Sequence, residues 1–145
     1  MSEAQKEDHG RDNAEAWADE IRTQCARHRK AEAAGRWDED AEDADEIADE
    51  AREGALSVEV RSGWHAPGDK DAAEPVEFRI VLTFGGPSLE LIGKLGLHDE
   101  PQDAELRYSS GWQPWTRYTD AREVDEVSLP EALDWFAGLF YFGSG

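Results

Sequence analysis

Residues 78–97 read FRIVLTFGGPSLELIGKLGL and hold two runs of alternating apolar side chains around a glycine-rich turn. The first run places four large apolar residues on one face: Phe78, Ile80, Leu82 and Phe84. The second run repeats this pattern, with Gly93 in line, at Leu89, Leu91, Leu95 and Leu97. A period of two residues is typical of a strand with one buried face. The break at 85–87 (Gly-Gly-Pro) therefore predicts a tight antiparallel hairpin.

Two further strands and a helix extend this hairpin. Apolar and polar residues also alternate at Leu56, Val58 and Val60, and again at Ala104, Leu106 and Tyr108. Residues 129–142 (LPEALDWFAGLFYF) carry Pro130 in the first turn and Leu133 and Phe136 at helical spacing. The expected fold class is α+β, with a four-stranded antiparallel sheet covered on its apolar face by the C-terminal helix.

The N-terminal part has a helical pattern and few large apolar residues. A helix is expected from Asn13, its N-cap, to Ala34, with a narrow stripe formed by Trp17, Ile21 and Cys25. A second helix is expected over 38–53, capped by Asp38. These helices form an acidic hairpin that is either weakly docked or partly disordered in isolation. The expected division is a disordered tail (1–12), the hairpin (13–54) and the sheet with its helix (55–145), in a single domain overall.

The charge of the chain limits its partners. Asp and Glu number 34 against 15 Lys and Arg, a net charge of −19. Such a surface repels phosphate backbones and anionic lipids, so direct binding to nucleic acid or to a membrane is disfavoured. The polar N-terminus does not resemble a signal peptide, which predicts a cytoplasmic protein. Three interpretations of the acidity remain open: solubility or salt adaptation, binding to a basic protein, and imitation of a nucleic acid.

No catalytic or metal-binding motif is recognisable in the sequence. The four histidines lack zinc-ligand spacing, and the single cysteine, Cys25, cannot form a thiolate cluster by itself. The acidic run at 38–50 lacks the central glycine and closing glutamate of a calcium loop. We therefore expect no catalytic residues, no metal and no cofactor.

Two groups of residues are candidates for partner binding. The first is the acidic run: Asp38, Glu39, Asp40, Glu42, Asp43, Glu46, Asp49 and Glu50. The second consists of three tryptophans in expected loops: Trp64, Trp112 and Trp115. Loop tryptophans act either as lids that close the core or as anchors of a recognition surface, and both interpretations stay open.

Residues 55–142 resemble a family of small uncharacterised proteins of proteobacterial phages, prophages and plasmids. The resemblance is carried by four segments: SVEVRSGWH at 57–65, GGP at 85–87, WQPWT at 112–116 and FYFG at 140–143. The family often has a cysteine where this chain has Thr83, so no thiol role carries over. No activity comes with the resemblance. It implies a mobile-element setting, in which small acidic proteins often bind and block host defence machinery.

The expected function is that of a non-enzymatic acidic protein that binds a basic surface of a host protein. Together with the resemblance, this predicts an inhibitor of the anti-CRISPR or anti-restriction type, with nucleic-acid mimicry as one mode of action. Two alternatives remain: a phage accessory or assembly domain whose acidity serves only solubility, and an enzyme whose active site has no recognisable motif. A mimic needs carboxylates spaced like phosphates, whereas an enzyme needs a pocket with perturbed titratable groups.

Overall fold

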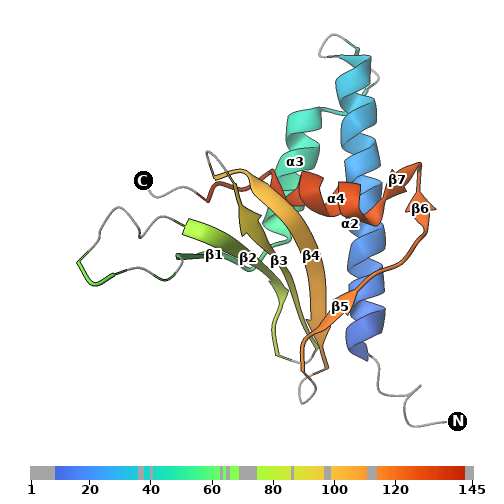
Figure 1. The fold of residues 1–145 in the computed structure, drawn as a ribbon. Coiled ribbons are helices and arrows are strands. Elements are labelled where there is room, and N and C mark those ends of the chain that lie inside the picture. The colour runs from blue at the N-terminus through green and yellow to red at the C-terminus, as the bar shows by residue number, and fades with distance from the viewer. Residues whose placement is uncertain are drawn as a thin grey trace, which may run out of the picture.

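The computed structural model describes residues 9–35, 38–39, 41–62, 64, 66–68, 75–85, 87–96, 99–110 and 114–142. In this part of the chain, an antiparallel sheet carries helices on one face (Figure 1). The predicted α+β class, with N-terminal helices and a C-terminal helix on the sheet, is confirmed.

The main sheet has five strands in the order β1-β2-β3-β4-β5, each antiparallel to its neighbours. They are β1 (Ser57–Ser62), β2 (Pro75–Thr83), β3 (Ser88–Leu95), β4 (Pro101–Ser109) and β5 (Thr116–Tyr118). The first four match the predicted strands. The fifth was not predicted, because it is only three residues long and has no apolar alternation. A separate two-stranded hairpin follows, formed by β6 (Glu123–Val124) and β7 (Val127–Ser128).

The hairpin at the centre of the sheet forms as its sequence predicts. Gly85 has a φ of +115°, a conformation that glycine adopts without a Cβ penalty, and its backbone N–H donates to Ser88 Oγ at 3.2 Å. Because the turn begins there, β2 ends at Thr83, and Phe84 is 83% exposed. The prediction that Phe84 belongs to the buried face is therefore wrong. Its other members Phe78, Ile80 and Leu82 are buried.

Helix α4 (Leu129–Ala137) packs on the apolar face of the sheet, mainly at β4. Ser128 is its N-cap, accepting a hydrogen bond from the backbone N–H of Glu131, and Pro130 lies in its first turn. Leu133 and Phe136 are buried, as predicted. The helix ends five residues before Phe142 because the chain turns at Gly138, and Phe142 then packs its ring 4.7 Å from that of Phe78.

Helix α2 (His9–Ala34) is part of the same core, and α4 lies across it (Figure 1). Ala14, Ala18, Ile21 and Cys25 have no solvent exposure, and Trp17 is half-buried against the core. The predicted apolar stripe of Trp17, Ile21 and Cys25 is therefore docked. Asn13 is not the N-cap that the sequence predicted. The helix begins at His9, where the backbone N–H of Gly10 donates to Ser110 Oγ at 3.3 Å. Asn13 instead donates its side-chain N–H to Thr83 Oγ1 at 3.1 Å.

Helix α3 (Ala44–Glu53) is shorter than the predicted segment 38–53. Its N-cap is Asp43, whose Oδ1 accepts the backbone N–H of Asp45 at 2.9 Å, and not Asp38. Of the predicted tail, residues 1–8 lie outside the described part, whereas residues 9–12 belong to α2.

Strand β1 differs from its prediction in burial. Val58 and Val60 are 39% and 46% exposed, because α2 and α4 pack against the sheet mainly at β4 and not at β1. The alternating pattern of the strand correctly gives the face on which each side chain lies. It does not show whether a helix reaches far enough to cover that face.

Candidate binding surfaces

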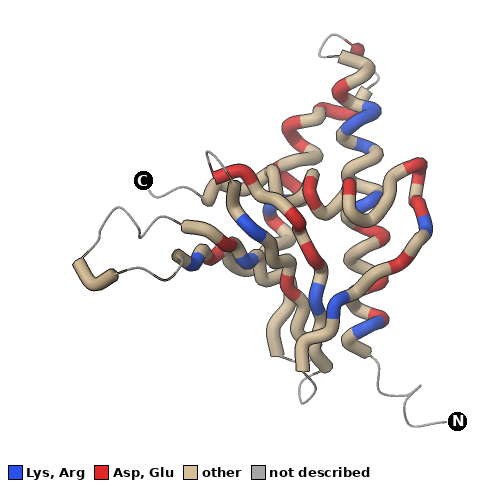
Figure 2. Tube along the Cα trace, in the orientation of Figure 1, with Lys and Arg blue, Asp and Glu red and all other residues tan. Residues whose placement is uncertain are grey.

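Helix α3 presents the acidic surface that the sequence predicted. Ile47, Ala48 and Ala51 are buried on its inner side, and the helix packs on α2. The opposite side is exposed and rich in Asp and Glu, which appear as red segments of α3, whereas the adjoining end of α2 carries both acidic and basic residues (Figure 2). The exposed candidates in the described residues are Asp38, Glu39, Glu42, Asp43, Glu46, Asp49 and Glu50. Asp40 lies outside the described residues.

Several of these carboxylates have partners in the fold. Glu42 accepts a hydrogen bond from Arg27 at 2.7 Å, which lowers the pKa of this carboxyl group. Arg27 lies 3.9 Å from Glu50, and Arg52 pairs with Asp49. Asp43 serves as the N-cap of the helix. Among the described members of the predicted set, Glu39 and Glu46 are exposed and have no ion pair, so their charge is not neutralised within the fold.

The two described candidate tryptophans, Trp64 and Trp115, are both exposed. Trp64 is fully exposed, Trp115 is 45% exposed, and Trp112 lies outside the described residues. Trp115 lines a hollow of about 290 Å³ together with Phe84 and Leu56, which are also exposed. Neither described tryptophan is a lid over the core, so the anchor interpretation is the one that their exposure favours.

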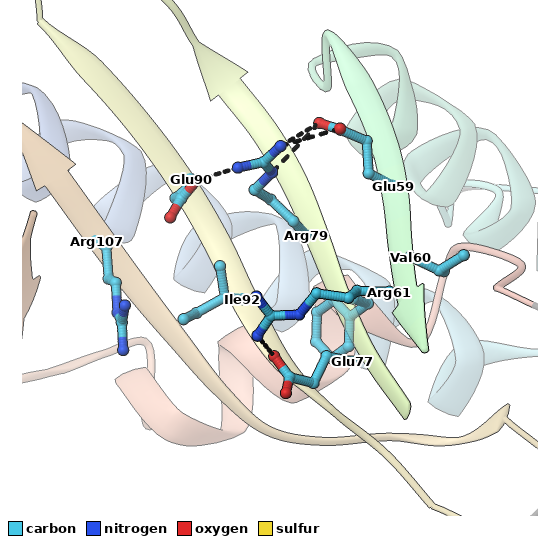
Figure 3. A pocket seen from close by; sticks show the side chains of 9 residues that line it. Glu59, Val60, Arg61, Glu77, Arg79, Glu90, Ile92 and Arg107 are labelled. Atoms are coloured by element: carbon cyan, nitrogen blue, oxygen red, sulfur yellow. Dashed lines mark hydrogen bonds and ion pairs between the residues drawn. The ribbon is translucent and has the colours of Figure 1, made fainter. Parts of the chain in front are cut away.

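The open face of the sheet carries a network of charges that the sequence analysis did not single out. Arg79 on β2 lies between two carboxylates, 2.9 Å from Glu59 on β1 and 3.8 Å from Glu90 on β3 (Figure 3). Beside them, Arg61 on β1 pairs with Glu77 on β2. These side chains border a hollow of about 420 Å³. Alternating Glu and Arg in β1 and β2 was a sequence signal for this network, since residues at a period of two share a face.

Glu90 is the most unusual member of this network. It is only 6% exposed, and burial raises the pKa of its carboxyl group, although Arg79 and Arg107 oppose the shift. A buried carboxylate with a raised pKa is a feature of acid–base sites. However, the described lining of the hollow contains no Ser, Cys or His that could act as a nucleophile or relay.

A buried ion-pair cluster ties α2 to the segment after β5. Arg22 has no exposure and donates to Asp120 Oδ1 and Asp19 Oδ1, each at 2.6 Å. Tyr118 donates its hydroxyl to Asp120 at 2.7 Å. The hydrogen bond from Arg22 holds the pKa of Asp120 well below its usual range, and burial together with Asp120 raises the pKa of Tyr118 to about 12. This cluster fixes two distant segments and is structural.

Cys25 is not in a reactive setting. Its side chain is buried among core residues, and burial raises the pKa of the thiol. The thiolate, which is the reactive form, is thereby disfavoured.

Comparison with protein-family models, curated proteins and solved structures finds no match to this chain. The resemblance to a mobile-element family stays a prediction. In the described residues, no three His, Cys, Asp or Glu side chains are grouped to hold a metal ion. None of the described helices combines the length and the apolar composition that crossing a membrane requires.

Proposed function

We propose that this chain is a non-catalytic binding protein that engages a basic surface of another protein through α3 and the residues that precede it. The observation that carries the proposal is the ordered docking of α3. Its apolar side is buried against α2 while its carboxylates point outward. A surface that is already ordered loses less conformational entropy on binding than a disordered acidic tail would.

The charge of this segment gives the proposal its electrostatic basis. Residues 38–53 contain ten Asp or Glu residues and one Arg, in a chain of net charge −19. A concentrated field of one sign accelerates encounter with a basic partner and weakens as salt screens it. Ion pairs with Arg27 and Arg52 neutralise part of the charge of Glu42, Asp49 and Glu50. The remaining negative charge of this segment comes mainly from other carboxylates, which are Glu39, Asp45, Glu46 and Glu53.

The partner class follows from this charge. Proteins that bind nucleic acid present basic grooves lined with Lys and Arg, and an acidic helix is complementary to them. A nucleic-acid-binding complex of a host defence system, blocked by a protein from a mobile element, is the narrower form of this proposal. It rests on the motif resemblance in addition to the acidic helix.

The test uses charge reversal on one side of α3. Glu46, Glu50 and Glu53 are exposed and lie at helical spacings of four and three residues, so E46K/E50K/E53K reverses one stripe and spares the Asp43 cap. The matched control, D12K/E100K/E123K, makes the same change in charge at exposed positions on other elements. Partners are captured from a lysate of the host and identified, and their affinity is then measured at low and high salt.

We expect the α3 variant to lose partner affinity at low salt while the control keeps most of it. Parental binding should also fall steeply as salt rises. If both variants bind as well as the parent, α3 is only a solvated surface and the proposal is wrong.

The exposed aromatic hollow supports a second candidate surface. Phe84, Trp115 and Leu56 line it, and exposed aromatic side chains are common anchors of interfaces. Recognition through this hollow would depend little on salt and would be lost in W115A. Measuring W115A beside the α3 variant separates the two surfaces.

A further inference from the structure

Strand β1 is an edge of the sheet with a regular backbone. It is first in the strand order, and among the described residues only β2 pairs with it. Its register shifts only at the end, between Arg61 and Ser62. Val58 and Val60 lie exposed on the side of the sheet that elsewhere forms the core. An uncovered edge of this kind is a template for a further strand.

The charges on the open face alternate up to this edge. Directly paired residues on β3, β2 and β1 form the row Lys94, Glu77 and Arg61. The neighbouring row is Ile92, Arg79 and Glu59. One row therefore ends at the edge in a positive side chain, and the next one ends in a negative side chain.

We propose that β1 pairs with β1 of a second copy of this chain, antiparallel and about a two-fold axis centred on Val60. In this register Val60 lies opposite Val60 of the second copy, and Glu59 lies opposite its Arg61. A two-fold interface uses each contact twice, so Arg61 also lies opposite Glu59 of the second copy. The two sheets join into one continuous sheet with both open faces on the same side.

Charge complementarity selects this register. The row that begins Lys94, Glu77, Arg61 continues with Glu59 and then Arg79 of the second copy, so the signs alternate across the junction. Centring the axis on Glu59 or on Arg61 instead would place like charges directly opposite each other, which destabilises a strand pair. On the other face, Val60 meets Val60, and the exposed apolar area of both strands decreases.

The surface next to the β1 edge has little net charge, so two acidic molecules can approach each other there. Each chain has a net charge of −19, which opposes self-association in general. On the open face next to the edge, Glu59 and Glu77 are balanced by Arg79 and Arg61. This region is locally neutral, and its Glu and Arg residues are in the order that a second copy requires.

The experiment measures the molecular mass of the full chain by sedimentation and light scattering, over about 1 μM to 1 mM, a range that covers weak homodimers. We expect the parent to reach twice its 16.2 kDa mass. E59R places Arg opposite Arg61 of the second copy, and R61E places Glu opposite its Glu59, so each variant should be monomeric by itself. An equimolar mixture restores both opposite-charge pairs and should dimerise.

Matched controls reverse charge away from this edge. R117E acts on β5, at the opposite edge of the sheet, and E123R acts on β6. Both should dimerise as the parent does. Recovery in the mixture also shows that E59R and R61E are folded, since an unfolded chain cannot supply a strand.

Three results would overturn the proposal. A parent that stays monomeric over the whole range excludes the dimer. A parental dimer that E59R and R61E leave intact is held together by another surface. Single variants that are monomeric and remain so when mixed, with the controls dimeric, exclude the register centred on Val60.

Discussion

Phe136 lies in the middle of the core, without solvent exposure, and its ring is 5.3 Å from that of Phe140. We expect Phe136→Ala to lower the free energy of unfolding by about 3–5 kcal/mol, because the cavity left behind adds to the lost burial. Urea denaturation measures this. Phe84→Ala is the matched control. Because Phe84 is 83% exposed, this substitution should lower the free energy of unfolding only slightly. Equal losses for the two variants would contradict the observed packing.

Asp120 makes stability depend on pH. Its pKa is held below the value of about 3.9 that an unfolded chain gives an aspartate. Its contribution is therefore fully present above that value and is lost as pH falls through the lower, folded-state pKa. We expect Asp120→Asn to reduce stability at neutral pH by about 1–3 kcal/mol and to make the loss of stability below about pH 5 less steep than in the parent. Urea titrations of the parent and of Asp120→Asn, from pH 7 to pH 2, measure both effects.

The matched control for Asp120 is Val127→Ala, at a buried apolar position, because it lowers stability without removing a titrating group. It should keep the parental slope of stability against pH. An unchanged slope in Asp120→Asn as well would mean that the pair with Arg22 does not shift the titration of this carboxylate.

At the scale of the element, the N-terminus of α3 can be used to test whether Asp43 or Asp38 is the N-cap of the helix. Asp43→Ala removes the side chain that accepts the N–H of Asp45, and an N-cap of this kind contributes about 0.5–2 kcal/mol. We expect faster hydrogen exchange in the first turn of α3 in this variant. Asp38→Ala should leave exchange in that turn unchanged. The opposite result would restore the longer helix that the sequence predicted.

The sequence correctly predicted those elements that are determined by residues close together in the chain. The alternation of Ile80, Leu82, Leu89 and Leu91 depends on neighbouring positions, and it correctly gave the central hairpin. The start of α2 could not be predicted, because the partner of Gly10 is Ser110, 100 positions away. For α3, Asp38 and Asp43 are both acceptable caps by residue type, and only docking onto α2 distinguishes them.

The same reasoning applies to the candidate surfaces. The exposed carboxylates of α3 could be predicted from composition, since a helix so acidic must be solvated on most sides. The ion pairs of Glu42 and Glu50 with Arg27 could not, because they depend on how α3 lies against α2. The burial of Glu90 was also unpredictable, as it depends on side chains from neighbouring strands.

At the scale of the whole molecule, the net charge of −19 opposes binding to polyanions. We expect no binding to double-stranded DNA in a gel shift at about 0.15 M salt, because such binding is driven by release of counterions to basic side chains. A basic DNA-binding protein run in parallel shows that the assay can detect binding. Sub-micromolar affinity of the chain would show that a local cationic surface overrides the net charge.

The contacts of α2 have a consequence for synthesis of the chain. Helix α2 packs on α4, and Arg22 pairs with Asp120, 98 positions later. On the ribosome, α2 therefore emerges long before the residues that cover it. Until α4 has been synthesised, the apolar stripe of α2 is either exposed to water or bound by a chaperone. A nascent chain stalled before α4 would keep Ile21 and Cys25 uncovered, and it would be prone to aggregate or to be degraded.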